Sequence, residues 1–273
     1  MKMTELSRRF EREDERVKDE LRWLFFDDVI DTYVERDFFA KLCRREVREL
    51  ESGFIALPQK LRAIAVHHAV LINRIGICKA VLCALNSLKM DINTGFETDF
   101  YGIPPLMTVC RNHCKRSFLT LVNDGGADLS VSDENGHTLA RACVESLDLS
   151  FMQMAQKYGV SFDVSDPIDA LFPFAAENNY YPALYWLIEN LNGDANMTDE
   201  DEHSTLDYAC FNENLQIFLY LLDKGAKMTD KREALFNLII DQIKELQKQP
   251  SSKKIDNRIH YHINTLHFLM TSA

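Results

Sequence analysis

Four glycines recur along this chain at nearly constant spacing, and this spacing constrains the fold more than any other feature. Gly126, Gly159, Gly193 and Gly225 follow one another at intervals of 33, 34 and 32 residues. Such a period is typical of a repeat protein and not of a single globular core. Each glycine comes just after an apolar run of helical period. We therefore expect each one to end a helix with a positive φ angle, which glycine adopts at low cost.

Within the repeat region, each repeat is predicted to hold a turn, a short helix, a longer helix and a loop. In the second repeat, residues 133–136 form a turn sequence and Thr138 is placed to cap the helix that follows. The expected apolar face of the first helix is Leu139, Ala142 and Cys143. The expected face of the second helix consists of Leu147, Phe151, Met154 and Ala155.

The repeats resemble ankyrin repeats. Residues 102–106, 136–143 and 204–210 are similar to the G-x-T-P-L-H-x-A-A opening of that family, and 225–228 resemble its closing G-A-D-V. The resemblance covers roughly residues 60–230 and implies an all-α ankyrin-repeat solenoid. The chain also departs from the pattern: the second repeat lacks Pro after Thr138, the third opens at 168–176 without Gly or Thr, and Glu202 occupies a turn-glycine position.

Four segments are expected along the chain. They are a helical N-terminal segment (1–52), a degenerate first repeat (57–97), four ankyrin-like repeats (98–230) and C-terminal capping helices (231–273). Repeat arrays need caps because each repeat buries its apolar face only on its neighbours. The predicted C-terminal cap has a one-sided apolar face, formed by Leu235, Leu238, Ile239, Ile243 and Leu246.

Composition indicates an ordered intracellular protein. The chain has 273 residues, of which 46% are hydrophobic and 27% charged. Its seven cysteines are an odd number and lie within helical patterns, which favours free thiols in a reducing compartment, cytoplasmic or nuclear. The first residues lack the apolar core of a secretory signal. The most apolar stretch, 63–85, contains too many polar and charged side chains for a transmembrane helix, so no membrane association is expected.

Charge is distributed unevenly. Counting Lys, Arg, Asp and Glu, the net charge is zero over residues 1–97, −14 over 98–230 and +3 over 231–273. An acidic repeat region repels phosphate backbones and attracts cationic segments, which argues against direct nucleic-acid binding. The alternative is that this charge only keeps the protein soluble.

Candidate catalytic and metal-binding residues are few. Cys110, His113 and Cys114 lie close in sequence, but Cys110 falls on a core position and no fourth zinc ligand accompanies the trio. Adjacent histidines such as His67 and His68 diverge by about 100° on a helix. No nucleotide-binding, metalloprotease or hydrolase motif occurs. We therefore predict a protein that is not an enzyme and needs no cofactor or metal.

The family resemblance implies a partner-binding face. In ankyrin proteins the turn tips and the exposed positions of the first helices line a concave surface, and here that surface would mix aromatic and acidic side chains. The predicted function is a non-catalytic scaffold or adaptor that binds a basic or mixed basic-apolar segment of another protein. The residues placed on this face are Phe100, Tyr101, Ile103, Arg111, Asn112, Glu134, Asn135, His137, Glu145, Asp199, Glu200, Asp201, Glu202, His203, Phe211 and Asn212.

Alternatives remain for these residues. Phe100 and Tyr101 would be structural if they fold back onto Leu106, and 199–202 would be only a solvated turn if the acidic charge serves solubility. A second hypothesis places partner binding or self-association on aromatic N-terminal helices, with the repeats as structure. The aromatic residues concerned are Trp23, Phe25, Phe26, Tyr33, Phe38 and Phe39.

Overall fold

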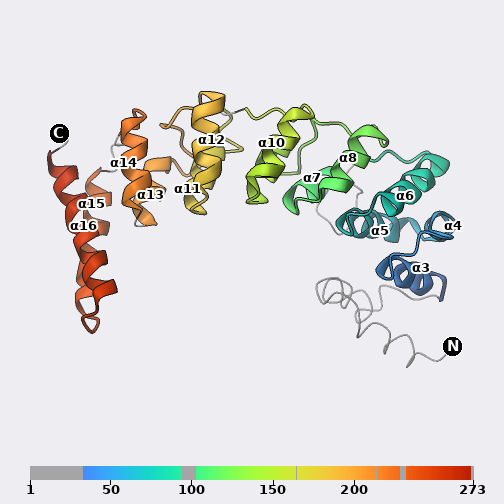
Figure 1. Cartoon of the computed structure of the whole chain (residues 1–273), viewed down its shortest axis with the longest axis horizontal. Coiled ribbons are helices and arrows are strands. Elements are labelled where there is room, and N and C mark those ends of the chain that lie inside the picture. The colour runs from blue at the N-terminus through green and yellow to red at the C-terminus, as the bar shows by residue number, and fades with distance from the viewer. Residues whose placement is uncertain (1–32, 94–102, 164, 213, 228–231, 272–273) are drawn as a thin grey trace. The chain divides into compact units, whose positions relative to one another are not determined.

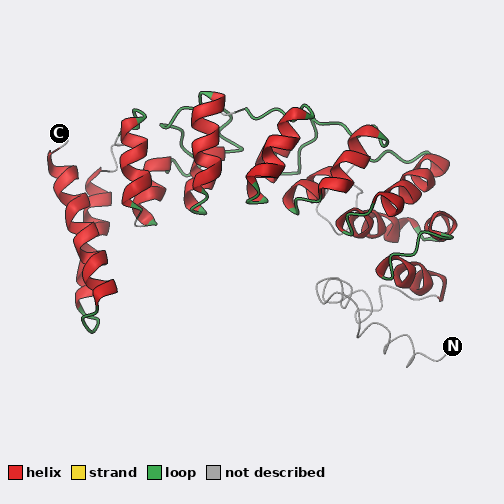
Figure 2. Cartoon of the chain, in the orientation of Figure 1, coloured by secondary structure: helices red, strands yellow, loops and turns green. Residues whose placement is uncertain are grey.

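The computed structural model describes residues 33–93, 103–163, 165–212, 214–227 and 232–271. The regular elements in these ranges are α-helices joined by short loops (Figures 1 and 2), and the strand-like pairing there is limited to two isolated bridges, Ser132 with Thr138 and Thr198 with Ser204. The predicted all-α fold class is confirmed. The chain divides into two compact units, a first unit (Met1–Ser146) and a second unit (Leu147–Ala273), each described by itself.

Helices in both units come mostly in pairs, a first helix followed after a tight turn by a second. The described helices of the first unit are α3 (Tyr33–Cys43), α4 (Leu50–Ala56), α5 (Gln59–Leu71), α6 (Ile75–Leu88), α7 (Pro105–Arg111), α8 (Lys115–Asn123) and α9 (Leu139–Glu145). Those of the second unit are α10 (Leu149–Lys157), α11 (Leu171–Glu177), α12 (Tyr181–Leu191), α13 (Thr205–Phe211), α14 (Leu215–Asp223), α15 (Arg232–Gln247) and α16 (Lys253–Thr271).

The first helices α7, α9, α11 and α13 are all seven residues long and begin at residues 105, 139, 171 and 205. They stack on one another within each unit, α7 on α5 and α9 in the first unit and α11 on α13 in the second. Most of their apolar side chains, including the thiols of Cys110, Cys143 and Cys210, are almost completely buried, and Phe211 at the end of α13 is an exception. The repeat period of the sequence is therefore the period of this helix stack.

A left-handed residue links the two helices of four pairs. It is Asn73 between α5 and α6, His113 between α7 and α8, Leu147 between α9 and α10, and Asn179 between α11 and α12, with φ between 44° and 56°. The prediction that Leu147 lies on the apolar face of the second helix is wrong. Leu147 precedes α10 and is 49% exposed. It is the left-handed residue of the turn before α10, a conformation that strains the backbone of a non-glycine residue.

The glycine pattern is confirmed at three positions and wrong at one. Gly126, Gly159 and Gly225 have positive φ angles, whereas at the end of α12 it is Asn192 that adopts the left-handed conformation, with φ 54°. Gly193 serves packing instead: a Cβ built there would lie 1.8 Å from Cζ of Phe172, a fully buried ring. The expected turn glycine is thus a close-approach glycine.

Asparagine side chains tie one repeat to the next. In the first unit, Asn73 Oδ1 accepts from the backbone N–H groups of Arg116 (2.8 Å) and Ser117 (3.1 Å), and so caps α8. In the second unit, Asn196 accepts from the Lys227 N–H at 2.6 Å and donates to the Gly225 carbonyl at 3.2 Å. These side-chain amides form hydrogen bonds with backbone N–H and C=O groups of loops and helix ends, which have no backbone partner within their own repeat.

Helices α3 and α4 form a small aromatic core. Phe38 meets Phe39 and Phe54 edge to face at ring-centroid distances of 5.3 and 6.0 Å, and all three rings are buried. Phe38 and Phe39 are therefore not available as the partner surface that the N-terminal hypothesis assigned to them. Trp23, Phe25 and Phe26 lie outside the described residues.

At the other end of the second unit, α15 packs against α16. Ile239 and Leu246, two residues of the predicted apolar face, are buried there together with the polar His262 and Thr265 of α16. That this hairpin caps the stack stays a prediction.

Two buried histidines on α5 make the first unit sensitive to acid. His67 and His68 are almost fully buried, and Nδ1 of His67 lies 2.8 Å from the Thr108 hydroxyl on α7. Burial lowers the pKa of both imidazoles from 6.5 to about 4, and for His67 the neighbouring His68 adds to the shift.

We predict that the free energy of unfolding falls as the pH drops from 6.5 towards 4. In that window the unfolded chain binds protons that the folded chain does not, which costs about 2 kcal/mol per histidine between pH 7.5 and pH 5. Urea titrations over this range measure the slope. His68→Leu should roughly halve it, the exposed His113→Gln should leave it unchanged, and equal slopes for wild type and His68→Leu would contradict the prediction.

We also predict that Gly193→Ala destabilises the second unit by about 1–3 kcal/mol, because the new methyl group overpacks against Phe172. The loss should shrink in a Phe172→Leu background, which removes the ring. Gly225→Ala is the control, since nothing lies within 4 Å of its added Cβ and only its φ of 87° is strained. Urea unfolding of all combinations tests this, and an equal cost of Gly193→Ala in both backgrounds would refute it.

Candidate functional site

Two turns of the same geometry precede α9 and α13, one in each unit. Asp133 Oδ1 accepts from the backbone N–H groups of Asn135 (3.0 Å) and His137 (3.1 Å). Asp199 Oδ1 accepts in the same way from Asp201 (3.0 Å) and His203 (2.9 Å). An aspartate with free N–H groups two and four residues later favours such a turn. These aspartates shape the turn tips on which the predicted binding residues lie.

Each turn leads into a capped helix. Thr138 accepts from the N–H of Ala140, as the sequence predicts, and Ser204 forms a capping box with Asp207 at the start of α13. At the left-handed turn position, Gly136 has φ 82° and Glu202 has φ 59°. Glu202 therefore takes the conformation of the glycine that it replaces, at the cost of some backbone strain.

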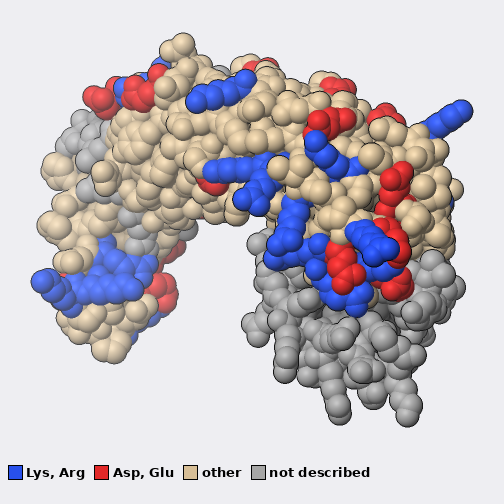
Figure 3. Space-filling view, turned by 45° about the vertical axis from the view of Figure 1, so that its right-hand side comes forward, with Lys and Arg blue, Asp and Glu red and all other residues tan. Residues whose placement is uncertain are grey.

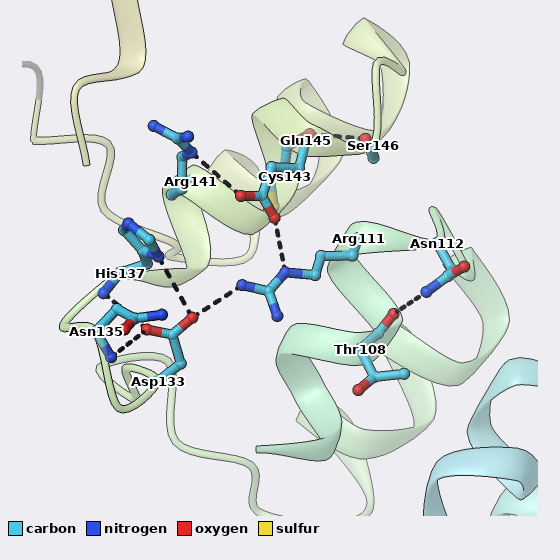
Figure 4. A network of polar contacts seen from close by, with 10 residues as sticks. All are labelled: Thr108, Arg111, Asn112, Asp133, Asn135, His137, Arg141, Cys143, Glu145 and Ser146. Atoms are coloured by element: carbon cyan, nitrogen blue, oxygen red, sulfur yellow. Dashed lines mark hydrogen bonds and ion pairs between the residues drawn. The ribbon is translucent and has the colours of Figure 1, made fainter. Parts of the chain in front are cut away.

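In the first unit a guanidinium group fills the space beside this turn (Figure 4). Arg111, the last residue of α7, donates from Nη2 to Asp133 Oδ2 at 2.9 Å and from Nε to Glu145 Oε2 at 2.6 Å. Arg141 donates to the other oxygen of Glu145 at 3.2 Å. His137 Nδ1 lies 3.5 Å from Asp133. Two guanidinium groups thus neutralise two carboxylates between neighbouring repeats.

Burial and hydrogen bonding act in opposite directions on Asp133, whose side chain is only 5% exposed. Burial alone would raise the pKa of its carboxyl group, but the bonds from Arg111 and from the turn N–H groups hold it below the usual value. The ion pair is therefore part of the repeat interface of the first unit and not an open charge.

In the second unit an aromatic cluster lies beside the corresponding turn. The rings of His203, Tyr208 and Phe211 pack edge to face, with centroid distances of 5.8 Å (His203–Tyr208), 5.9 Å (His203–Phe211) and 6.0 Å (Tyr208–Phe211). The Tyr208 hydroxyl donates to Asp199 Oδ2 at 2.7 Å. Phe211 and the side chain of His203 are each 37% exposed. An anchored tyrosine therefore supports two rings that solvent reaches.

Carboxylates surround this cluster. Partial burial, and then the carboxylates of Asp199, Glu177 and Asp201, raise the pKa of the Tyr208 hydroxyl far above its ordinary value. Glu177 and Asp201 are exposed, as are Glu200 and Glu202 on the turn. We call Glu177, Asp201, His203, Tyr208 and Phe211 the aromatic-acidic patch. It joins the end of α11 to the turn and first helix of the next repeat.

A sequence profile of ankyrin repeats matches residues 139–232 as three copies. Those copies begin at α9 and include the α11–α12 and α13–α14 helix pairs. Residues 139–232 are ankyrin repeats. No curated protein sequence matches the chain. Ankyrin repeats are generally protein–protein interaction modules and are typically non-catalytic.

Of the predicted binding residues, those on the ankyrin turn tips are mostly exposed. Glu134, Asn135, Glu200, Asp201 and Glu202 reach solvent, whereas Ile103, His137, Asp199 and His203 are partly buried. Phe100 and Tyr101 lie outside the described residues. The described tip residues fall into two groups, 103–137 in the first unit and 199–203 in the second.

The predicted residues on the first helices have contacts within the protein. Arg111 and Glu145 bind each other, and the Asn112 amide donates to the Thr108 carbonyl at 2.9 Å (Figure 4). The Asn212 amide donates to the carbonyls of Ala176 and Glu177, both at 2.8 Å, and so closes the end of α11. Phe211 differs from these because its ring is exposed. Among the predicted first-helix residues it is the one best placed for a partner.

Sequence reasoning missed Tyr208 and the anchoring role of Asp133 and Asp199. The two aspartates occupy the same position relative to the Thr or Ser helix cap, five residues before it, which is a signal that the sequence contains. Tyr208 carries no such signal, because its hydrogen bond to Asp199 depends on how α13 sits against its own turn.

Two basic residues at the end of α3 and just after it form ion pairs. Arg44 binds Glu46 at 2.8 Å, and Lys41 binds both Asp37 (2.9 Å) and Glu49 (3.0 Å). Figure 3 shows basic and acidic side chains intermixed on the described surface of the first unit. Within the described ranges no set of three or more His, Cys, Asp or Glu side chains is arranged to hold a metal ion. None of the described helices is both long and apolar enough to span a bilayer.

We predict that Arg111→Met lowers the free energy of unfolding by about 1–3 kcal/mol, because it leaves the poorly exposed carboxylate of Asp133 without a guanidinium and Glu145 with Arg141 alone. Arg116→Met, which removes the same charge from an exposed side chain of α8, should cost less than about 0.5 kcal/mol. Denaturant unfolding of both variants makes the comparison. Equal losses of unfolding free energy in the two variants would contradict the prediction, because the ion pairs of Arg111 would then contribute no more to stability than the charge of an exposed arginine.

Proposed function

We propose that the protein is a non-catalytic scaffold or adaptor that binds a basic or mixed basic-apolar segment of a partner protein through the second unit. The proposal rests mainly on one observation: exposed carboxylates at Glu200, Asp201 and Glu202 adjoin the partly exposed ring of His203, which packs on the exposed ring of Phe211. Aromatic side chains supply interface energy, and a carboxylate rim steers a cationic partner towards it.

The first unit offers a poorer surface for the same partner. There the corresponding aspartate and Glu145 already bind Arg111, so a cationic segment would compete with an internal guanidinium. The hypothesis of binding through the N-terminal helices loses Phe38 and Phe39, which are buried. These contrasts favour the second unit.

An intracellular setting, cytoplasmic or nuclear, fits the cysteines. All seven lie in the described part of the chain and none forms a disulfide there; six are buried. Free thiols of this kind persist where glutathione keeps the compartment reducing.

Peptides selected by display on the immobilised protein at low salt test the proposal. We expect enrichment of sequences that combine Arg or Lys with apolar residues. In fluorescence anisotropy at about 50 mM salt, Glu200→Lys should weaken binding of these peptides about three- to tenfold and flatten its salt dependence. The matched charge reversal Asp223→Lys, at the exposed end of α14, should leave both unchanged. Equal behaviour of the two variants would overturn the proposed surface.

A further inference from the structure

The two units use the same turn but differ in the residues beside it. Arg111, Glu145, Glu177 and Phe211 are the last residues of α7, α9, α11 and α13, so they occupy one equivalent position in successive repeats. In the first unit the turn aspartate and Glu145 hold the guanidinium of Arg111 from the preceding repeat.

In the described part of the second unit, the position that corresponds to this guanidinium is held by an acid. Glu177 occupies the position of Arg111, and Phe211 occupies the position of Glu145. Asp199 uses the oxygen that corresponds to the Arg111 acceptor to bind Tyr208 instead. The second unit thus has an acid, Glu177, at the position of the cation of the first unit. It has an exposed aromatic ring, Phe211, at the position of the second acid of the first unit.

Nothing nearby in sequence supplies a compensating charge. Residues 158–223 contain 13 Asp and Glu and neither Lys nor Arg. Lys224, the next cation, binds Glu189 at 2.8 Å. The Tyr208 hydroxyl donates to Asp199 Oδ2 at 2.7 Å, and the amide of Asn212, the residue after Phe211, donates to the Glu177 carbonyl at 2.8 Å, so acidic residues of two repeats lie at the aromatic cluster. The patch is therefore suited to a cation that comes from another molecule.

The ring geometry indicates which cation fits. Because the centroids of the three rings are only 5.8–6.0 Å apart, the rings touch one another and leave no space between them for an ammonium group. A ligand must lie on the outer surface of His203 and Phe211. A planar guanidinium can stack there and can also donate hydrogen bonds from its edge to carboxylates. An ammonium group donates to carboxylates but stacks poorly on a ring.

We propose that the aromatic-acidic patch binds an arginine side chain of the partner protein. The guanidinium stacks on Phe211 and His203 and donates to Glu177. This inference rests on the proposed function, whose partner it describes more closely: the recognised segment must present an accessible arginine.

Titration with small arginine compounds tests the patch without a known partner. The protein, with its eight histidines isotope-labelled on the ring, is titrated with N-acetylargininamide and followed by NMR; His203→Gln identifies the His203 signal. We expect a saturable shift of that signal in the millimolar range. N-acetyllysinamide should bind at least about threefold more weakly, and the neutral citrulline analogue should cause no saturable shift.

Two variants connect the shift to the patch. Phe211→Leu and Glu177→Gln should each weaken N-acetylargininamide binding about threefold, and Asp223→Asn, on α14, should not change it. Both patch side chains are exposed, so thermal unfolding of the variants should match that of the wild type. An unmoved His203 signal, equal shifts by the arginine and lysine compounds, or no effect of Phe211→Leu would overturn the arginine site.

The outcomes separate the two proposals. If Glu200→Lys weakens peptide binding but the arginine compound has no preference at His203, the proposed function stands and the arginine site is wrong. If the arginine compound binds as expected but Glu200→Lys has no effect on peptides, the arginine site stands and the acidic turn is not the steering surface. Self-association in sedimentation that is lost in Phe211→Leu would overturn a separate partner and identify a second copy of the chain.

Discussion

Stacking of one short helix on the next is the interaction on which this structure depends. A seven-residue helix has no stability of its own in water, because nucleation costs more than so few hydrogen bonds return. Stacking of α7 between α5 and α9, and of α11 on α13, buries the apolar sides of these helices and makes them persist. Each repeat is consequently stable only in the presence of its neighbours.

Where one repeat packs on the next, backbone N–H and C=O groups of loops and helix ends need hydrogen-bond partners. Side chains from adjacent repeats supply them. Asn73, Asn196 and Asn212 each bond to the backbone of another repeat. The aspartate turns serve the same purpose within a repeat, since Asp133 and Asp199 each accept two N–H groups. Once the backbone is satisfied in this way, the residues at the tips and helix ends are free to vary. One turn geometry therefore supports a closed ion pair in the first unit and an exposed aromatic-acidic surface in the second.

The periodicity of the sequence correctly predicted the features that depend on local conformation. The helix pairs, the Thr138 cap and the left-handed Gly126, Gly159 and Gly225 all follow from short-range sequence signals. Gly193 and Leu147 did not follow the expectation. Asn192 takes the left-handed conformation at the end of α12, while the Phe172 ring lies against Gly193. Leu147 lies before α10 with a φ of 53°. Of the candidate site, the exposed carboxylates of the turn were predictable from composition, whereas the pairing of Arg111 with Glu145, 34 residues away, was not.

By itself the sequence determined that the chain is an acidic stack of helix pairs with a period near 33 residues, because spacing, apolar periodicity and charge are properties of the chain alone. Only the tertiary structure decided which charges pair between neighbouring repeats. Equivalent positions on successive repeats come within hydrogen-bonding distance only when the helices stack, and there a cation such as Arg111 cancels neighbouring acids while a residue such as Glu177 adds to them. The difference between the ion pair of the first unit and the surface proposed for binding in the second therefore lies in which residues the stack brings together.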